Sequence, residues 1–114
     1  MVESSRVAMC GRHHPLTVDD AFDLLADRQR RTVLVALLEE SPLDVHGLFS
    51  DAARETDGGL LQVRHSHLPK LHRRGLIEWD REAGTVSRGP EFKAIRPVLE
   101  VCGAHDEKFP GGWP

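Results

Sequence analysis

The stretch that decides the fold runs from residue 65 to residue 88 and reads HSHLPKLHRRGLIEWDREAGTVSR. Its first part has leucines at helical spacing and stops at Gly75, the residue type expected just past the end of a helix. The period then changes: residues 76–80 and 85–88 read as two strands, and residues 81–84 as the tight turn between them. A helix followed at once by a two-stranded hairpin predicts the recognition helix and wing of a winged helix-turn-helix.

Three further helices are expected before this stretch. Thr17 begins the first, because an acid follows three positions later as in a capping box, and Val18, Phe22 and Leu25 are expected to share the apolar face of this helix. Asp27 caps a second helix that runs to about Glu40, where Ser41-Pro42 ends it, because proline cannot continue a helix. Asp44 caps a short third helix. These bounds predict a mainly α fold with a β-hairpin wing.

A fourth helix is expected from about Leu60 to Arg74, after a loop at residues 54–59 that ends in Asp-Gly-Gly. The order is then helix, helix, helix, loop, helix, hairpin. The predicted organisation is a flexible N-terminal arm at 1–16, the winged helix-turn-helix domain at 17–89, a C-terminal helix at 90–104 and a tail at 105–114.

The C-terminal helix has an apolar face and an internal proline, Pro97, that is expected to kink it. Its face is formed by Phe92, Ile95, Leu99 and Cys102. The sequence leaves open whether this face packs in cis or forms the seam of a homodimer. The tail, rich in glycine and proline, is expected to be unstructured or lightly docked.

The charge of the chain is distributed unevenly. Its 12 arginines and 3 lysines stand against 18 acids, so the net charge of −3 argues against coating nucleic acid by bulk electrostatics. Residues 13–57 carry ten acids and four bases, whereas residues 58–77 carry four bases and no acid. The attraction for anions is therefore concentrated in the fourth helix. The scarcity of lysine and the excess of acids are also typical of proteins that stay hydrated in concentrated salt.

The sequence gives no sign of a membrane span, a signal peptide or a disulfide framework. The longest apolar run is 33–38, far short of a span, and the chain has two cysteines. We therefore expect a cytoplasmic protein whose thiols stay reduced.

The fourth helix and the hairpin carry the candidate DNA-binding side chains. On an ideal helix Leu68 and Leu71 face the core, and the opposite face can enter the major groove of double-stranded DNA. The candidates are Gln62, Ser66, His67, Lys70, Arg73 and Arg74 on the helix, and Arg81 and Arg88 on the hairpin. Lys70 and Arg74 suit phosphates, and the hairpin arginines suit an adjacent minor groove or the backbone. A basic start of the second helix, at residues 28–31, fits either a phosphate contact or a solvated surface.

The segment 65–71, followed by Gly75-Leu76-Ile77-Glu78-Trp79-Asp80 and Gly84-Thr85-Val86, resembles a family of small archaeal winged-helix domains found mainly in halophiles. That family shows a T-H-L-P-K-L-like stretch, then a glycine, two aliphatics, an acid and an aromatic. The resemblance extends over roughly residues 16–88 and implies a DNA-binding regulator of transcription. Gly47 departs from the family, which has a helix former there.

The sequence also bears on two function classes other than regulation through DNA. No nucleophile elbow, P-loop or dinucleotide fingerprint is present, so we expect no enzymatic activity and no cofactor. The alternative is a winged-helix module that binds a protein partner without DNA. Two Cys-Gly-x-His pieces, Cys10 with His13 and Cys102 with His105, have the ligand types of a zinc site, but chance similarity between two tails is the preferred reading.

Overall fold

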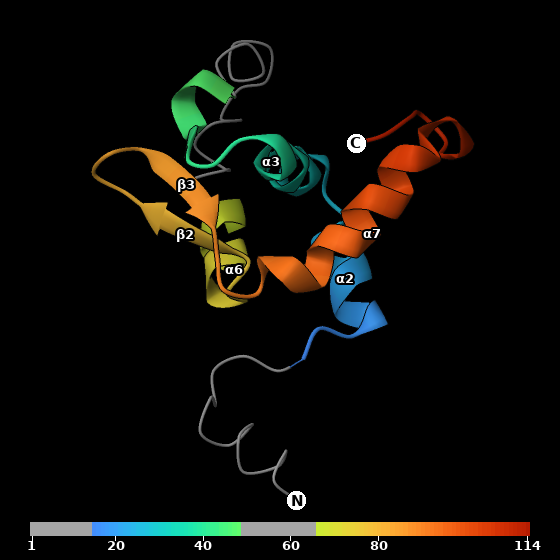
Figure 1. Ribbon diagram of the computed structural model, residues 1–114, viewed down its shortest axis with the longest axis horizontal. Helices are drawn as coiled ribbons and strands as arrows, with labels where there is room; N and C mark the ends of the chain where they lie inside the picture. The colour runs from blue at the N-terminus through green and yellow to red at the C-terminus, as the bar shows by residue number, and fades with distance from the viewer. Residues whose placement is uncertain (1–14, 49–65) are drawn as a thin grey trace, which may run out of the picture.

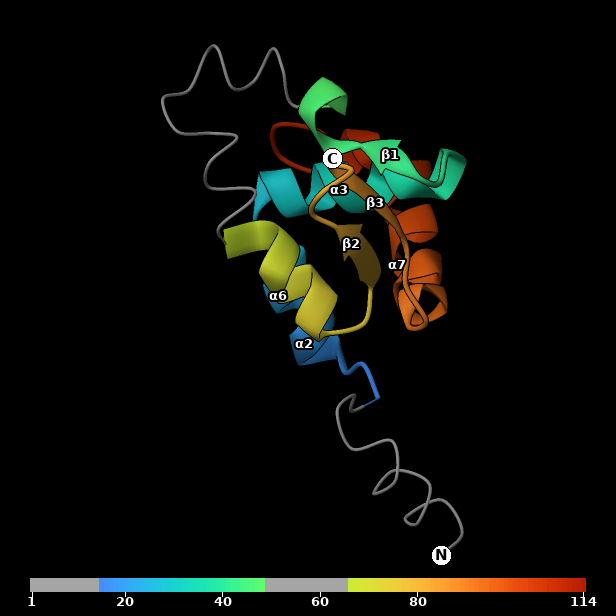
Figure 2. The ribbon, with the colours of Figure 1, turned by 90° about the vertical axis from the view of Figure 1, so that its left-hand side faces the viewer.

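The computed structural model describes residues 15–48 and 66–114, and the fold follows from these two stretches. The helices are α2 (Val18–Leu24), α3 (Arg28–Glu39), α6 (Leu68–Arg73) and α7 (Phe92–Ala104), with a 3-10 turn η2 (Asp106–Lys108) after α7. The strands are β1 (Leu43–Asp44), β2 (Ile77–Asp80) and β3 (Thr85–Arg88). In Figure 2, α2 and α6 lie on one side of the β2–β3 hairpin, α7 lies on the other, and α3 crosses above them. This is a mainly α fold with a β-hairpin wing, the arrangement of a winged helix-turn-helix.

The first two of the three predicted N-caps, Thr17 and Asp27, are confirmed here. The Thr17 hydroxyl accepts from the backbone N–H of Asp20, and the Asp20 carboxylate accepts in return from the Thr17 N–H, which completes a capping box. The Asp27 carboxylate accepts from the N–H groups of Gln29 and Arg30 at the start of α3. Side-chain acceptors thus satisfy N–H groups that a helix start leaves without an intrahelical partner.

The sheet has a third strand that the sequence pattern did not predict. β1 pairs antiparallel with β3, Leu43 opposite Val86 and Asp44 opposite Thr85, so the strand order is β1-β3-β2. Two residues are too short for an alternation to be visible. The predicted third helix follows β1: the Asp44 carboxylate accepts from the His46 N–H, and residues 45–48 are helical. The remainder of that helix, the loop at 54–59 and the start of the fourth helix lie outside the described residues.

The core lies where α3, α6, α7 and the hairpin meet (Figure 1). Its fully buried side chains are Leu24, Val33, Leu34, Leu37, Leu68, Leu71, Leu76, Ile77, Val86, Ile95 and Leu99. α7 contributes Phe92, Ile95 and Leu99 to this core. The sequence left open whether the apolar face of α7 packs in cis or forms a dimer seam, and these three side chains pack in cis. Burial of such side chains stabilises the fold by about 1.5–3 kcal/mol each before entropy is counted.

The predicted apolar face of α2 is only partly buried. Val18, Phe22 and Leu25 share a stripe on α2, but the structure buries Ala21, Leu24 and Leu25 and leaves Val18 and Phe22 about two-thirds exposed. The small side chain of Ala21 lets α2 approach the core closely. Phe22 is therefore a surface residue, and it borders a hollow described below.

Two glycines fix the passage from α6 into the wing. Gly75 adopts a φ of +76°, and the Leu76 N–H reaches back to the Leu71 carbonyl, as in a Schellman motif. Gly84 adopts +72° in the hairpin turn, where the Asp80 carboxylate accepts from the N–H groups of Glu82 and Ala83. Both positions need a left-handed backbone that glycine adopts without strain.

Candidate nucleic-acid interface

α6 divides its side chains as the helical spacing predicts. Leu68 and Leu71 are fully buried, whereas Ser66 and Arg73 are exposed. Gln62 lies outside the described residues. No ion pair or hydrogen bond holds the Arg73 guanidinium among residues 15–48 and 66–114, so the centre of the open face carries an available cation.

Lys70 and Arg74 lie at one edge of that face and are paired with acids of α2. Lys70 Nζ lies 2.9 Å from Asp23 Oδ2, and Arg74 Nη2 lies 3.0 Å from Asp20 Oδ2. The hydrogen bond from Lys70 holds the pKa of Asp23 below its usual value. Since the Asp23 carboxylate is largely exposed, solvent screens this ion pair and keeps it weak, so Lys70 can exchange Asp23 for another anion.

His67 is buried at the start of α6 rather than at the margin of an open face. Its Nε2 lies 3.4 Å from Asp27 Oδ1, and its Nδ1 lies 3.2 Å from Arg30 Nη1. A guanidinium can only donate, so Nδ1 must be unprotonated and the ring neutral. Burial away from water, with the nearby cations of Arg30 and Lys70, lowers the pKa of His67 against the opposing pull of Asp27. This position serves the joint between α3 and α6.

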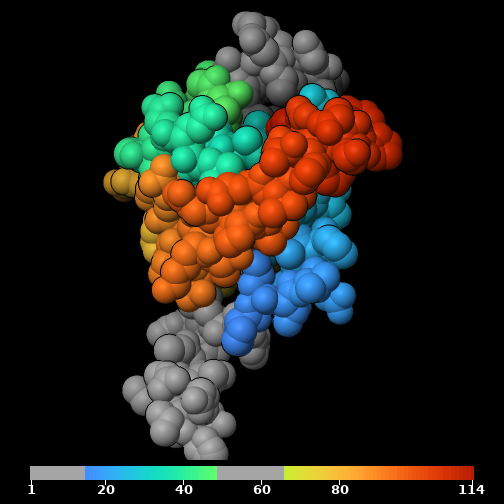
Figure 3. All heavy atoms as spheres, turned by 45° about the vertical axis from the view of Figure 1, so that its right-hand side comes forward, coloured from blue at the N-terminus to red at the C-terminus, as the bar shows by residue number. Residues whose placement is uncertain are grey.

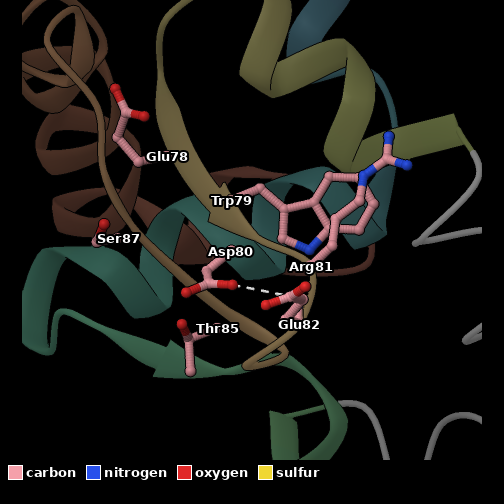
Figure 4. Close-up of a pocket in the computed structure, with 7 residues that line it drawn as sticks. All are labelled: Glu78, Trp79, Asp80, Arg81, Glu82, Thr85 and Ser87. Atoms are coloured by element: carbon pink, nitrogen blue, oxygen red, sulfur yellow. Dashed lines mark hydrogen bonds between the residues drawn. The ribbon is translucent and has the colours of Figure 1, made fainter.

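The wing has one basic and one acidic side. The Arg81 guanidinium stacks over the Trp79 indole, 4.5 Å from its centroid, on the side of the hairpin where α6 lies (Figure 4). Glu78 and Asp80 point to the opposite side, over a shallow hollow that Thr85 and Ser87 also line. An acidic surface repels phosphate, so the charge of the wing favours an anionic partner on the α6 side only.

Arg88 is exposed and extends from the wing across the C-terminal end of α3. Its Nε donates to the Leu37 carbonyl at 2.6 Å and its Nη2 to the Leu38 carbonyl at 3.3 Å, at the C-terminal end of α3. These carbonyls lack an intrahelical partner, and a cation suits the negative end of the helix dipole. The guanidinium of Arg88 is thereby committed to the fold.

The same use of arginine explains the basic start of α3. Arg30 donates to the carbonyls of Leu24 and Asp23, and Arg31 donates to the carbonyl of Leu25 at 2.7 Å. Both side chains therefore close the C-terminal end of α2. Sequence reasoning missed this role; the short connection between the two helices was the available signal, because it brings the start of α3 beside the end of α2.

The zinc candidates fall in two places. Cys10 and His13 lie outside the described residues. Cys102 is half-buried, where burial raises the pKa of its thiol, and His105 is exposed just after α7. Within the described stretches, no three His, Cys, Asp or Glu side chains are grouped closely enough to hold a metal ion. In the same stretches, no helix has the length and apolar character that a membrane crossing requires.

The open face of α6, with Arg73 at its centre and Arg81 beside it on the wing, is thus the surface best suited to an anionic partner. Comparison with curated proteins and with solved structures gave no significant match. A family model matches residues 22–87, which run from within α2 almost to the end of β3 and are more than half of the 114 residues. The chain therefore belongs to the family described as "Domain of unknown function (DUF7344)".

Proposed function

We propose that this protein is a DNA-binding regulator of transcription that inserts α6 into the major groove and sets the wing beside it. The observation that carries the proposal is the pair of cations without a carboxylate partner on one side of the fold. Of the five lysines and arginines between residues 66 and 88, Lys70, Arg74 and Arg88 have intramolecular partners, and Arg73 and Arg81 have no carboxylate partner among the described residues. A major groove admits a helix of this kind, and arginine reads guanine edges in a bidentate manner.

The proposed assembly is a homodimer, so that two copies of α6 address successive major grooves about 34–36 Å apart. Because Phe92, Ile95 and Leu99 are buried in cis, the seam would use the outer side of α7, where Ala94, Pro97 and Val101 are exposed. Sedimentation equilibrium tests this: a wild-type dimer that becomes monomeric with Val101→Glu supports it, and a wild-type monomer at DNA-binding concentrations contradicts it.

The test of DNA binding is a fluorescence-anisotropy titration with random-sequence duplex, comparing the wild type with Arg73→Glu. We expect the substitution to weaken binding by at least about fivefold, because one phosphate or base contact is worth about 1–3 kcal/mol. Arg73 is the right position because it is exposed and has no partner in the described stretches. A glutamate at Lys70 would instead face Asp23 and disturb the α2–α6 contact.

The matched control is Lys93→Glu, which makes the same change of charge on α7. Lys93 is exposed on α7, and Figure 2 shows that α7 lies on the side of the hairpin away from α6. We expect its affinity to stay within about twofold of the wild type. An equal loss of affinity in both variants would show that the effect comes from net charge alone. Absence of DNA binding by the folded wild type at any salt concentration would overturn the proposal.

The second candidate, a module that binds a protein, is favoured by the ion pairs on α6. Asp20 and Asp23 neutralise two cations of the basic helix, and the outer side of the wing is acidic. A surface of mixed charge suits a protein partner as well as a phosphate backbone. This candidate predicts that the folded wild type has no measurable affinity for DNA even at low salt, and that Arg73→Glu does not alter this result.

A further inference from the structure

A hollow of about 350 Å³ opens between α2, α7 and the C-terminal tail, away from α6 and the wing. Its wall is mostly apolar: Phe22 from α2, Val98 and Cys102 from α7, and Phe109 and Trp113 from the tail. Figure 3 shows this side of the molecule, with α2 in blue below the red end of α7 and the tail. The volume lies within the range of about 300–1,000 Å³ typical of small-molecule sites.

The tail that closes the hollow is ordered by its own contacts. The rings of Phe109 and Trp113 lie 5.5 Å apart, and Trp113 is half-buried against the core. The Gly112 N–H donates to the Phe109 carbonyl, which turns the chain back toward α7. A rigid aromatic wall costs a ligand little ordering entropy when it binds.

A single charged side chain, Arg31, is present among the residues that line the hollow. Its guanidinium lies 5.9 Å from the centroid of the Trp113 ring, and its Nη1 donates to the Leu25 carbonyl. An arginine has five N–H donors, and the described residues accept from Arg31 through this one bond. No carboxylate lines the hollow in the described stretches, so a cation with unused donors stands at the edge of an apolar wall.

We propose that this hollow is a binding site for a small monocarboxylic acid with an apolar body, the carboxylate held by Arg31 and the body packed between Phe22 and Trp113. Charge complementarity selects the class: a guanidinium with free donors binds a carboxylate through paired, charge-assisted hydrogen bonds. The aromatic rings and Val98 then exclude water from the rest of the molecule. The site is separate from the candidate DNA surface, and its existence does not depend on DNA binding.

The test uses 4-phenylbutyrate as the probe, and its uncharged counterpart 4-phenylbutanamide, with Trp113 as the reporter. The chain has two tryptophans, so Trp79→Phe leaves Trp113 alone. In that background we expect a saturable fluorescence change with the acid and a weaker one with the amide. Arg31→Met should weaken binding of the acid by at least about tenfold and leave the amide within about twofold, because the charged contact serves the acid alone, whereas loss of the Arg31 contacts to Leu25 and Trp113 affects both ligands equally.

Three variants separate binding from folding. Arg31→Lys keeps the charge and should recover part of the affinity for the acid. Arg28→Met removes an exposed arginine from the same helix and should leave the affinity for both ligands unchanged. Cys102→Phe fills part of the hollow without adding a tryptophan and should abolish binding of both ligands, with the helical circular dichroism unchanged.

Two results would overturn the proposal. One is that the acid and the amide bind the folded protein with equal affinity, or that neither binds. The other is a wild-type dimer that Cys102→Phe converts to a monomer, which would make the hollow part of a subunit interface.

Discussion

His67 is the residue whose protonation is expected to matter most for stability. Its Nδ1 accepts from Arg30, and its Nε2 faces Asp27 at the joint between α3 and α6. The folded state therefore holds the ring neutral, and its pKa lies below the unfolded value of about 6.5. As pH falls through that value, the unfolded chain takes up the proton first. Stability is thus fully present above pH 6.5 and is lost progressively below it.

We predict that the urea midpoint of unfolding is lower at pH 5.5 than at pH 7.5, and that His67→Gln removes most of this difference. His105→Gln is the matched control, since His105 is exposed, and it should keep the full pH dependence. Circular dichroism at the two pH values measures both. An unchanged pH dependence in His67→Gln would show that another group is responsible.

The sequence predicted which residues are buried or cap a helix better than it predicted which partners the charged side chains contact. The leucines of α6 and the caps at Thr17 and Asp27 follow from spacing and local chemistry, and the structure confirms them. The partner of Arg88 was not predictable, because it is 51 residues away and depends on which helix end lies nearby in three dimensions, whereas for Arg30 the short connection between α2 and α3 was a signal. An arginine looks the same in the sequence whether its guanidinium faces solvent or closes a helix.

The link between α6, the wing and α7 has no spare room at Gly89. The Gly89 N–H donates to the Leu76 carbonyl, and the Glu91 N–H donates to the Gly75 carbonyl. A Cβ at Gly89 would meet the Gly75 carbonyl oxygen and would lie 2.8 Å from the Ile77 nitrogen. Both are backbone atoms of the strand entry, so neither can move without shifting the wing.

We predict that Gly89→Ala lowers the free energy of unfolding by about 1–3 kcal/mol, the range for overpacking. Gly103→Ala is the matched control inside α7, where a Cβ would meet only Trp113 Nε1, at 3.8 Å. That substitution should stabilise the helix by up to about 1 kcal/mol. Thermal melts of both variants measure the contrast, and equal effects would contradict it.

At the scale of elements, long periodic segments were predictable and short ones were not. The bounds of α3, β3 and the start of α7 match the sequence pattern closely. β1 was not predicted because two residues are too few to show a period. The orientation of α2 was not predicted because Phe22, expected on the apolar face, is exposed and Ala21 is buried. Tertiary packing decides such cases, since a short helix has two usable faces.

For the whole molecule, the acids of α2 lower the affinity of α6 for DNA, given the proposed function. We predict that Asp23→Asn strengthens DNA binding, because it releases Lys70 from its ion pair. The slope of log K against log salt should steepen by about 0.9 for one added phosphate contact. The measurement is an anisotropy titration across a salt series.

The matched control is Asp19→Asn, which makes the same charge change at an exposed position of α2. A local release of Lys70 predicts a larger gain for Asp23→Asn than for Asp19→Asn. Identical gains in the two variants would mean that only net charge matters.

The strand order β1-β3-β2 has a consequence for synthesis of the chain on the ribosome. β3 is the middle strand of the sheet and the last to be translated, so β1 waits for residues 85–86 before it can pair. Ile95 and Leu99 must then emerge before the core can close. Loop closure over such separations comes late in folding. A nascent chain halted before α7 would therefore expose its leucines to chaperones and proteases, and the domain would fold in a single step near the end of its translation.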